Sequence, residues 1–225
     1  MAYSGYILPA LIGLIAFLPS LLWALSLRKA ATRPVPLITC LLVFLWGATC
    51  GIIIALILEV FFPDNPGREY LLIEQALWMP VVAAPLCEEF AKGAGLSFFK
   101  SRLTSGRVGI VLGGFSGLGF AATENLFYEL GALYDSLTTY ILTAVIRSIA
   151  ACLLHGSASA VFGLGYGRQI ASKSSIIWML PYYGIAVFMH GAYNYMMSTG
   201  NYGLVGFGAT VFFTIIIWLI VRKMA

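Results

Sequence analysis

The sequence predicts an all-α fold, a polytopic transmembrane helix bundle of about seven spans, and three observations lead to this prediction. Of the 225 residues, 60% are hydrophobic and only 10% are charged, whereas soluble domains carry about 25% charged residues. Apolar runs of the roughly 20 residues that cross a bilayer core recur along the chain. Cations gather in alternate loops between these runs. So few charges cannot cover a water-exposed surface, so we expect a multi-pass protein of the cell membrane with the lipid bilayer as its solvent.

Seven spans are expected, in a single integral membrane domain that covers residues 1–225. The predicted spans are Tyr6–Leu27, Leu37–Phe62, Leu71–Phe99, Val108–Leu130, Leu137–Tyr166, Ile176–Ser198 and Tyr202–Val221. The first lacks the basic n-region of a signal peptide and is interpreted as a true span. Pro80 and Pro85 in the third span each remove a backbone donor and favour a kink. In lipid, such a kink persists only where protein or water satisfies the freed carbonyls. A kink just before Glu88 suits a polar cavity, although a kink that serves packing alone explains the prolines equally well.

The loop cations predict the topology. Ten of the thirteen Lys and Arg residues fall on one side of the predicted bundle, and no acid falls on that side. The ten cations are Arg28, Lys29, Arg33, Lys100, Arg102, Arg107, Arg168, Lys173, Arg222 and Lys223. The other side holds Arg68, with the acids Asp64, Glu69, Glu129 and Asp135 nearby. Cytoplasmic loops carry the excess of Lys and Arg, so the N-terminus is expected outside and the C-terminus in the cytoplasm. None of these loops resembles a basic patch for nucleic acid.

Small residues at helical spacing predict where helices touch. They are Gly109, Gly113, Gly117 and Ala121 in the fourth span, Gly156, Ala160, Gly163 and Gly167 in the fifth, and Gly47 and Gly51 in the second. Such stripes let two helix backbones approach closely. Glu124 lies three residues beyond Ala121, and His155 directly precedes Gly156. The polar residues are therefore expected on or beside packed faces rather than facing lipid.

Ionisable residues inside the predicted spans are the main functional signal. A charge near the bilayer centre costs about 2.5 to more than 10 kcal/mol, depending on the measure, so such residues usually face a cavity and mark function. Those well inside the spans are Glu88, Glu89, Lys92, Glu124, Arg147, His155 and His190. Glu59 and Glu74 lie near predicted outer ends, where snorkelling accounts for them.

The carboxylate pair on the third span allows two interpretations. Glu88 and Lys92 are four residues apart and share a helix face, whereas Glu89 points about 100° away and need not contact the same partner. One of the two glutamates could serve as a general base or acid. Alternatively, Glu88 and Lys92 form a buried ion pair that only fixes helix packing.

Both histidines of the chain, His155 and His190, lie inside spans, and amides accompany them. Asn194 shares a face with His190, and Asn125 follows Glu124. Facing helices of a bundle can join such groups in one site.

Two chemistries fit this set of residues. Either Glu and His activate a water while Asn or Arg stabilises an oxyanion, or Glu124, His155 and His190 bind Zn²⁺ while another Glu is the base. Cys152, Ser157 and Ser159 lie near His155, but no G-x-S-x-G turn surrounds them, which disfavours nucleophilic catalysis.

These residues also form four motifs. Glu88–Lys92 reads E-E-F-A-K, Phe120–Asn125 reads F-A-A-T-E-N, His155–Gly163 reads H-G-S-A-S-A-V-F-G, and His190–Asn194 reads H-G-A-Y-N. In order and character they resemble the PrsW family of intramembrane proteases. They resemble more distantly the type II CAAX prenyl endopeptidases and the multi-span scaffold subunit of γ-secretase. The motif-bearing core is expected over residues 71–198.

The resemblance implies a metallo- or glutamate-type enzyme that hydrolyses a peptide bond in a membrane-anchored protein or peptide. Anti-sigma factors are the substrate class linked with the family. Its glutamate pair maps onto Glu88 and Glu89 and its histidines onto His155 and His190. The main hypothesis is thus an intramembrane endopeptidase in which Asn194 and Asn125 stabilise the oxyanion or fix the imidazoles, and Lys92 and Arg147 tune carboxylate charge. A non-catalytic membrane scaffold and a proton-coupled transporter are the alternatives. The oligomeric state, the metal and the base within the glutamate pair stay open.

Overall fold

The computed structural model describes residues 4–31, 35–62, 77–200 and 202–224, and all regular structure in these ranges is helical. The elements are α1 (Ser4–Ala30), α2 (Leu37–Trp46), η1 (Gly47–Gly51), α3 (Ile52–Glu59), η2 (Met79–Ala83), α5 (Ala84–Ala94), η3 (Gly95–Arg102), α6 (Gly106–Asp135), α7 (Leu137–Ser172), η4 (Ile176–Met179), α8 (Leu180–Ser198) and α9 (Gly203–Lys223). Arg33, Arg68, Asp64, Glu69 and Glu74 lie outside the described residues.

The predicted all-α bundle is confirmed, and the helical segments follow the predicted spans. The segments α2–η1–α3, η2–α5–η3 and η4–α8 each continue without a gap, so the described part of the chain forms seven helical rods. Five of them are long and apolar enough to cross a membrane. The two that do not meet this measure are η2–α5–η3, which carries Glu88, and η4–α8, which carries His190. The site residues themselves lower the apolar character of these two rods.

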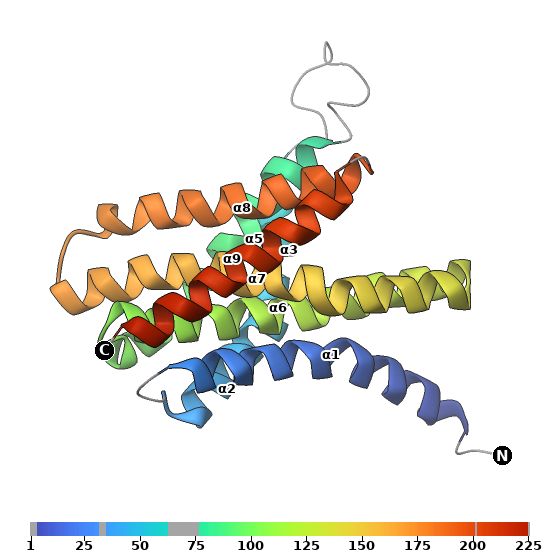
Figure 1. Cartoon of the computed structure of the whole chain (residues 1–225), viewed down its shortest axis with the longest axis horizontal. Coiled ribbons are helices and arrows are strands. Elements are labelled where there is room, and N and C mark those ends of the chain that lie inside the picture. The colour runs from blue at the N-terminus through green and yellow to red at the C-terminus, as the bar shows by residue number, and fades with distance from the viewer. Residues whose placement is uncertain (1–3, 32–34, 63–76, 201, 225) are drawn as a thin grey trace, which may run out of the picture.

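Helices α6 and α7 form a long antiparallel hairpin at the centre of the molecule (Figure 1). Helices α1 and α2 pack on one side of it, α5 and α8 lie on the other, and α9 crosses it diagonally and reaches α1. Ser136 separates the two helices, and its side chain accepts a hydrogen bond from the Thr139 N–H, which caps the start of α7. The hairpin therefore contacts every part of the bundle that contributes to the site.

The predicted glycine stripes form the contact between α6 and α7. A Cβ atom at Gly109 would overlap the backbone of Gly163, and one at Gly113 would overlap the backbone of Ser159. One at Gly117 would overlap the carbonyl of His155. The two backbones can approach this closely only because no side chain separates them, so these glycines fix the position of the His155 backbone relative to α6.

The two prolines change the helix that precedes Glu88 into a π-helix, η2, in which N–H groups bond five residues back. The N–H of Ala84 bonds to the carbonyl of Met79. The next bond of this series would join Pro85 to the Pro80 carbonyl, but proline has no N–H to donate. Asn194 Nδ2 of α8 donates to the Pro80 oxygen instead, at 2.7 Å. The regular α-helix thus gives way to a π-helix at the prolines, and protein satisfies the freed carbonyl. A bend of the helix axis stays a prediction.

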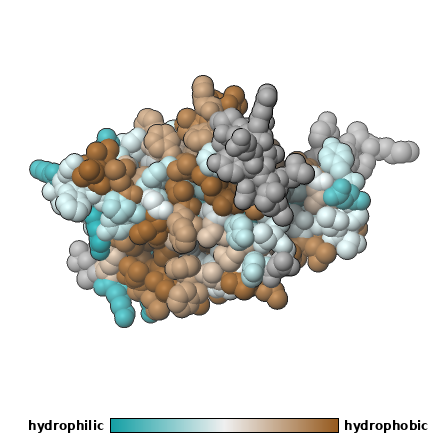
Figure 2. Space-filling model, turned by 90° about the horizontal axis from the view of Figure 1, so that it is seen from above, coloured by the Kyte–Doolittle hydropathy of each residue, from teal (hydrophilic) through white to brown (hydrophobic). Residues whose placement is uncertain are grey.

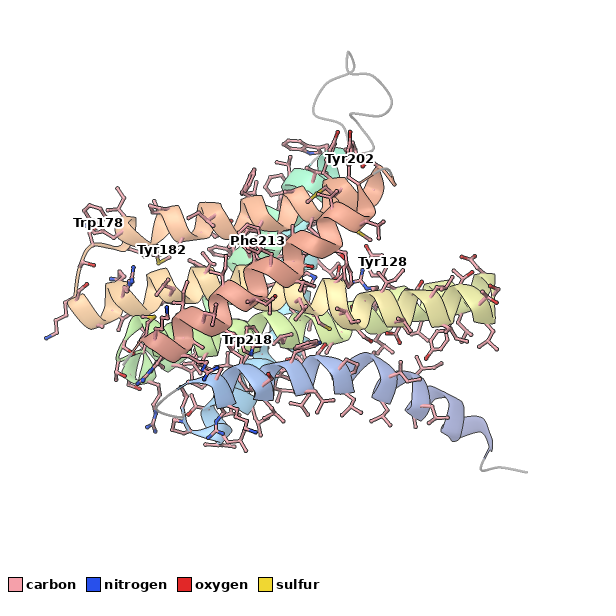
Figure 3. The ribbon with its side chains drawn as sticks, viewed as in Figure 1. Tyr128, Trp178, Tyr182, Tyr202, Phe213 and Trp218 are labelled. Carbon is pink, nitrogen blue, oxygen red and sulfur yellow. The ribbon has the colours of Figure 1, made fainter. Side chains whose placement is uncertain are left out.

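The outer surface fits a bilayer. A broad apolar band covers the middle of the molecule, with hydrophilic residues at both ends of its long axis (Figure 2). Trp178 and Tyr182 lie at the start of η4–α8, and Tyr202 lies beyond the other end of α8 (Figure 3), as expected of aromatic residues at the two membrane interfaces. The two ends of the chain lie at opposite ends of the bundle (Figure 1), which an odd number of spans requires. Which end faces the cytoplasm stays a prediction.

Candidate active site

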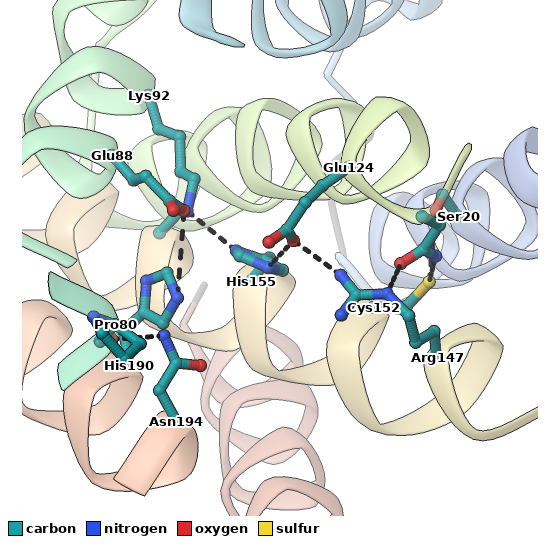
Figure 4. A network of polar contacts seen from close by, with 12 residues as sticks. Ser20, Pro80, Glu88, Lys92, Glu124, Arg147, Cys152, His155, His190 and Asn194 are labelled. Carbon is teal, nitrogen blue, oxygen red and sulfur yellow. Dashed lines mark hydrogen bonds and ion pairs between the residues drawn. The ribbon is translucent and has the colours of Figure 1, made fainter. Parts of the chain in front are cut away.

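Residues from α5, α6, α7 and α8 converge on one polar network inside the apolar bundle (Figure 4). The helix α5 contributes Glu88, Glu89 and Lys92, α6 contributes Glu124, α7 contributes Arg147 and His155, and α8 contributes His190 and Asn194. Carboxylates and imidazoles that lie up to a hundred residues apart in the sequence are thus brought together. The central spatial expectation of the sequence analysis is met.

Lys92 is the hub of this network and is fully buried. Its Nζ lies 3.1 Å from Glu88 Oε2, 2.8 Å from Glu89 Oε1 and 2.8 Å from His155 Nδ1. The ammonium also lies 4.1 Å from the centre of the Phe120 ring, a cation–π contact. The buried ion pair considered for Glu88 is present, and the same lysine also binds Glu89, so both carboxylates share one partner.

The contacts of His155 determine which of its ring nitrogens carries a proton. A lysine ammonium can only donate, so the Nδ1 that faces Lys92 must offer a lone pair. The proton of the neutral ring then lies on Nε2, which donates to Glu124 Oε2 at 2.7 Å. His155 therefore turns an available lone pair toward α5 and an N–H toward α6.

His190 is oriented in the same manner, by Glu89 of the glutamate pair on α5. Its Nδ1 lies 3.0 Å from Glu89 Oε1, and since a carboxylate accepts, Nδ1 carries the proton and Nε2 carries the lone pair. That Nε2 lies 3.8 Å from Glu88 Oε2. The second oxygen of Glu89 accepts a hydrogen bond from Ser159 Oγ at 2.8 Å. Glu89 is fully buried and acts as the residue that orients His190.

One group of three side chains could hold a metal ion among the described residues: Glu88, His155 and His190. Each offers one donor atom, and the three atoms lie within 4.8 Å of one another. Two imidazole nitrogens and one carboxylate oxygen form a ligand set of catalytic zinc sites. Each imidazole also donates its other N–H to a carboxylate, as metal-binding histidines commonly do. The residues present therefore fit a metal ion. Glu124, expected in the ligand set, contacts the opposite nitrogen of His155.

Arg147 holds Glu124 from the side opposite to His155. Its Nη2 donates to Glu124 Oε2 at 2.8 Å, and its Nε donates to Asn125 Oδ1 at 2.9 Å. The guanidinium lies 3.8 Å from the centre of the Tyr128 ring. Asn125 in turn donates to Cys152 Sγ. These contacts fix the orientation of Arg147 in a partly exposed position.

The network borders a cavity of about 330 Å³. Its lining residues are Pro80, Ala84, Glu88, Glu124, Tyr128, Ile146, Arg147, Ala151, His155, Tyr193, Asn194, Met197 and Ser198. Glu88 and Glu124 thus border one space, in which a water molecule and a peptide bond could meet both carboxylates and His155. Glu89 does not line it.

Comparison with known families agrees with this geometry. A family model described as PrsW family intramembrane metalloprotease matches residues 35–221. The chain belongs to this family. It is therefore an intramembrane protease, which acts on protein within a lipid bilayer. No curated protein and no solved structure matches the chain.

Within this PrsW-family site, two asparagines have other partners than those expected. Asn194 donates to the Pro80 carbonyl and Asn125 contacts Arg147 and Cys152, so neither is bonded to an imidazole. Both still border groups of the network, and their predicted roles in catalysis are not tested by these contacts.

Sequence reasoning considered Ser159 only as a possible nucleophile and explained Glu59 by snorkelling. Ser159 lies four residues after His155 on the same face of α7, a spacing that could have indicated it. Glu59 ends α3, half-buried, near enough to Glu88 for their charges to interact. Glu129, which the sequence groups with the acids near the outer loops, is fully buried inside α6.

Proposed function

We propose that this chain is an intramembrane endopeptidase that hydrolyses a peptide bond of a membrane-anchored protein with a water molecule activated between Glu88, Glu124, His155 and His190. One observation carries the proposal. One donor atom each of Glu88, His155 and His190 lie within 4.8 Å of one another beside a cavity, and one nitrogen of each ring is held by a carboxylate. Such support preorganises a site for chemistry rather than for packing alone.

A metal ion, for which Zn²⁺ suits the ligand types best, would be held by Glu88, His155 and His190. When bound it supplies a Lewis acid and a water that loses its proton near neutral pH. Glu89 keeps the lone pair of His190 directed at this position, and Ser159 keeps Glu89 in place. The motif glutamates thus have separate tasks, because Glu88 borders the cavity and Glu89 is enclosed.

Glu124 is the proposed proton acceptor. All its hydrogen bonds among the described residues use Oε2, so Oε1 can take a proton from water in the cavity and pass it to the leaving amine. Arg147 uses Nε and Nη2 in its hydrogen bonds. Its Nη1 can therefore donate to the carbonyl oxygen that gains charge as the peptide bond is attacked. Asn194 fixes the wall of the cavity by holding η2.

The proposed substrate is a protein anchored in the same membrane, and a membrane-anchored anti-sigma factor is the first candidate because of the motif resemblance. A cavity among membrane helices is accessible to a chain that already lies in the bilayer. On the face that Figure 2 shows, the apolar band would keep such a substrate in contact with lipid until it enters the cavity.

The proposal is tested with purified protein in liposomes that contain a single-span substrate of this class. We expect Glu88→Gln, Glu124→Gln and His190→Ala each to lower the cleavage rate by at least about 100-fold, since each removes a group that acts on the reacting atoms. Glu129→Gln is the matched control for Glu124→Gln: it makes the same change on α6 outside the cavity, and cleavage should persist. Thermal unfolding in detergent verifies that the variants fold. Cleavage at the wild-type rate by all three site variants would reject the assignment.

A further inference from the structure

Lys92 lies where a positive ion would lie between the acidic and imidazole groups of the site. Its ammonium is within 3.1 Å of Glu88 Oε2 and within 2.8 Å of His155 Nδ1, and both residues belong to the group that could bind a metal ion. No part of Lys92 is exposed. The chain therefore supplies its own cation to two of the three donor residues.

The two cations exclude each other at His155. The ring nitrogen Nδ1 has one lone pair, which can accept an N–H of Lys92 or bind a metal ion, but not both at once. The other nitrogen carries the proton that Glu124 accepts. Glu88 Oε2 is similarly occupied by the ammonium, and two cations so close together repel each other.

We infer that Lys92 and the metal ion compete for His155 and Glu88, so that Lys92 sets how tightly the metal is held. This inference rests on the proposed metal site. As the ion binds, Nζ leaves His155 Nδ1 and Glu88 Oε2 as an ammonium and keeps its bond to Glu89 Oε1. The ring of Phe120 stays beside it. No proton is released from Lys92 in this exchange, and the bonds lost to the lysine are replaced by bonds to the ion.

The contacts of Lys92 stabilise a site that contains two carboxylates inside a bilayer. Glu88 and Glu89 would repel each other if no cation lay between them, and a buried carboxylate without a partner is strongly destabilising. Without an ion, Lys92 holds both carboxylates and His155 together. With an ion bound, the ion would hold Glu88 and His155 while Lys92 stays with Glu89. The same contacts weaken metal binding, because the ion must displace an ammonium that is already hydrogen-bonded.

Substitution of Lys92 separates these effects. Lys92→Met keeps the length and packing of the side chain but removes the ammonium. We expect this variant to bind Zn²⁺ at least tenfold more tightly than the wild type, measured by competition with a fluorescent chelator in detergent. Zn²⁺ should also raise its thermal unfolding temperature more than that of the wild type. Lys100→Met is the matched control: it makes the same change of charge at an exposed position and should leave the affinity unchanged.

Two further variants keep the test decisive. Lys92→Gln, which is uncharged but polar, should also tighten Zn²⁺ binding, and it replaces Lys92→Met if the latter does not fold. Adding His190→Ala to either variant should abolish the tightened binding, which places the effect at this site. Equal or weaker affinity in the uncharged variants would overturn the inference. Since affinity is measured without substrate, a chain that cleaves nothing but shows these shifts would reject the proposed function alone.

Discussion

The two halves of the α6–α7 hairpin differ in what lies between the helices. In the half that contains Gly109, Gly113 and Gly163, backbone meets backbone and no side chain intervenes. In the other half, Glu124 and Arg147 fill the space with charged groups that bond across the pair. The first half has almost no freedom to shift, because its contacts are between backbones. Rigid apolar packing in one half thus determines where the polar groups of the other half can meet.

The boundary between the halves lies at Gly117, which faces the backbone carbonyl of His155. The glycine holds this turn of α7 against α6, and the imidazole is then directed between Lys92 and Glu124. A displacement of a fraction of an ångström here would lengthen hydrogen bonds of 2.7 and 2.8 Å.

The largest effect is expected from a large side chain in the glycine half. Gly113→Leu would force a side chain into the backbone of Ser159, which cannot rotate away. Overpacking usually costs about 1–3 kcal/mol and occasionally more, and a backbone obstacle puts this variant at the upper end or beyond. We expect failure to fold, measured by size-exclusion chromatography and thermal unfolding. Gly131→Leu is the control on the same helix, since a Cβ atom there meets open space; equal loss in both variants would contradict the assigned role of the stripe.

In the polar half, Arg147→Met should reduce activity more than stability. Asn125 Oδ1 would lose its donor, while Glu124 would keep the N–H of His155 and, being partly exposed, can be solvated. Loss of groups that orient a site typically costs 10–100-fold in activity, and we expect that range for the cleavage rate. Arg147→Lys should recover little, because the ammonium cannot reproduce the planar fork with which the guanidinium donates from Nε and Nη2. Arg168→Met, which removes an exposed contact with Tyr182 at the other end of α7, should cleave normally. A normal rate for Arg147→Met would contradict the prediction.

Two serines of α7 give a finer comparison. Ser159 donates to Glu89, whereas Ser157 bonds to Thr214 of α9 and not to the site. Loss of a partner to a buried polar group costs about 1–3 kcal/mol, so Ser159→Ala and Ser157→Ala should lower the free energy of unfolding by similar amounts. Only Ser159→Ala should also slow cleavage, because Glu89 would hold His190 less firmly. Equal rates for the two variants would show that Glu89 needs no second partner.

The sequence could predict the fold because a bilayer imposes strict lengths and because glycine spacing marks helix contacts. It also identified the ionisable residues of the site, since lipid makes each of them costly. The sequence could not predict beside which ring nitrogen of His155 each of the two glutamates, Glu88 and Glu124, would lie. That assignment depends on ring orientation and on the lateral offset between α5, α6 and α7, which side-chain packing sets.

Span ends were less predictable than span centres. The fourth span was expected to end at Leu130, where the apolar pattern fades, but α6 continues to Asp135. The helix extends because it pairs with the first turns of α7, which Ser136 caps. Glu129 therefore lies within a helix pair and not near a loop. A hairpin that packs on itself satisfies its own backbone, so its length need not follow hydropathy.

The smallest effect is expected at Glu129, which lies beyond the site on the same helix as Glu124. It is fully buried, and neither carboxylate oxygen has a hydrogen-bond partner within the described part of the chain. Glu129→Gln removes the charge and keeps the shape, so no favourable bond is lost. We expect the free energy of unfolding to rise by less than about 1 kcal/mol, since an unpaired buried group is relieved only in part. Thermal unfolding and the cleavage rate, set beside those of Glu124→Gln, measure this. A clear loss of cleavage in Glu129→Gln would extend the functional half of the hairpin by more than a helical turn toward Asp135, because only a residue that takes part in the reaction would respond to so mild a change.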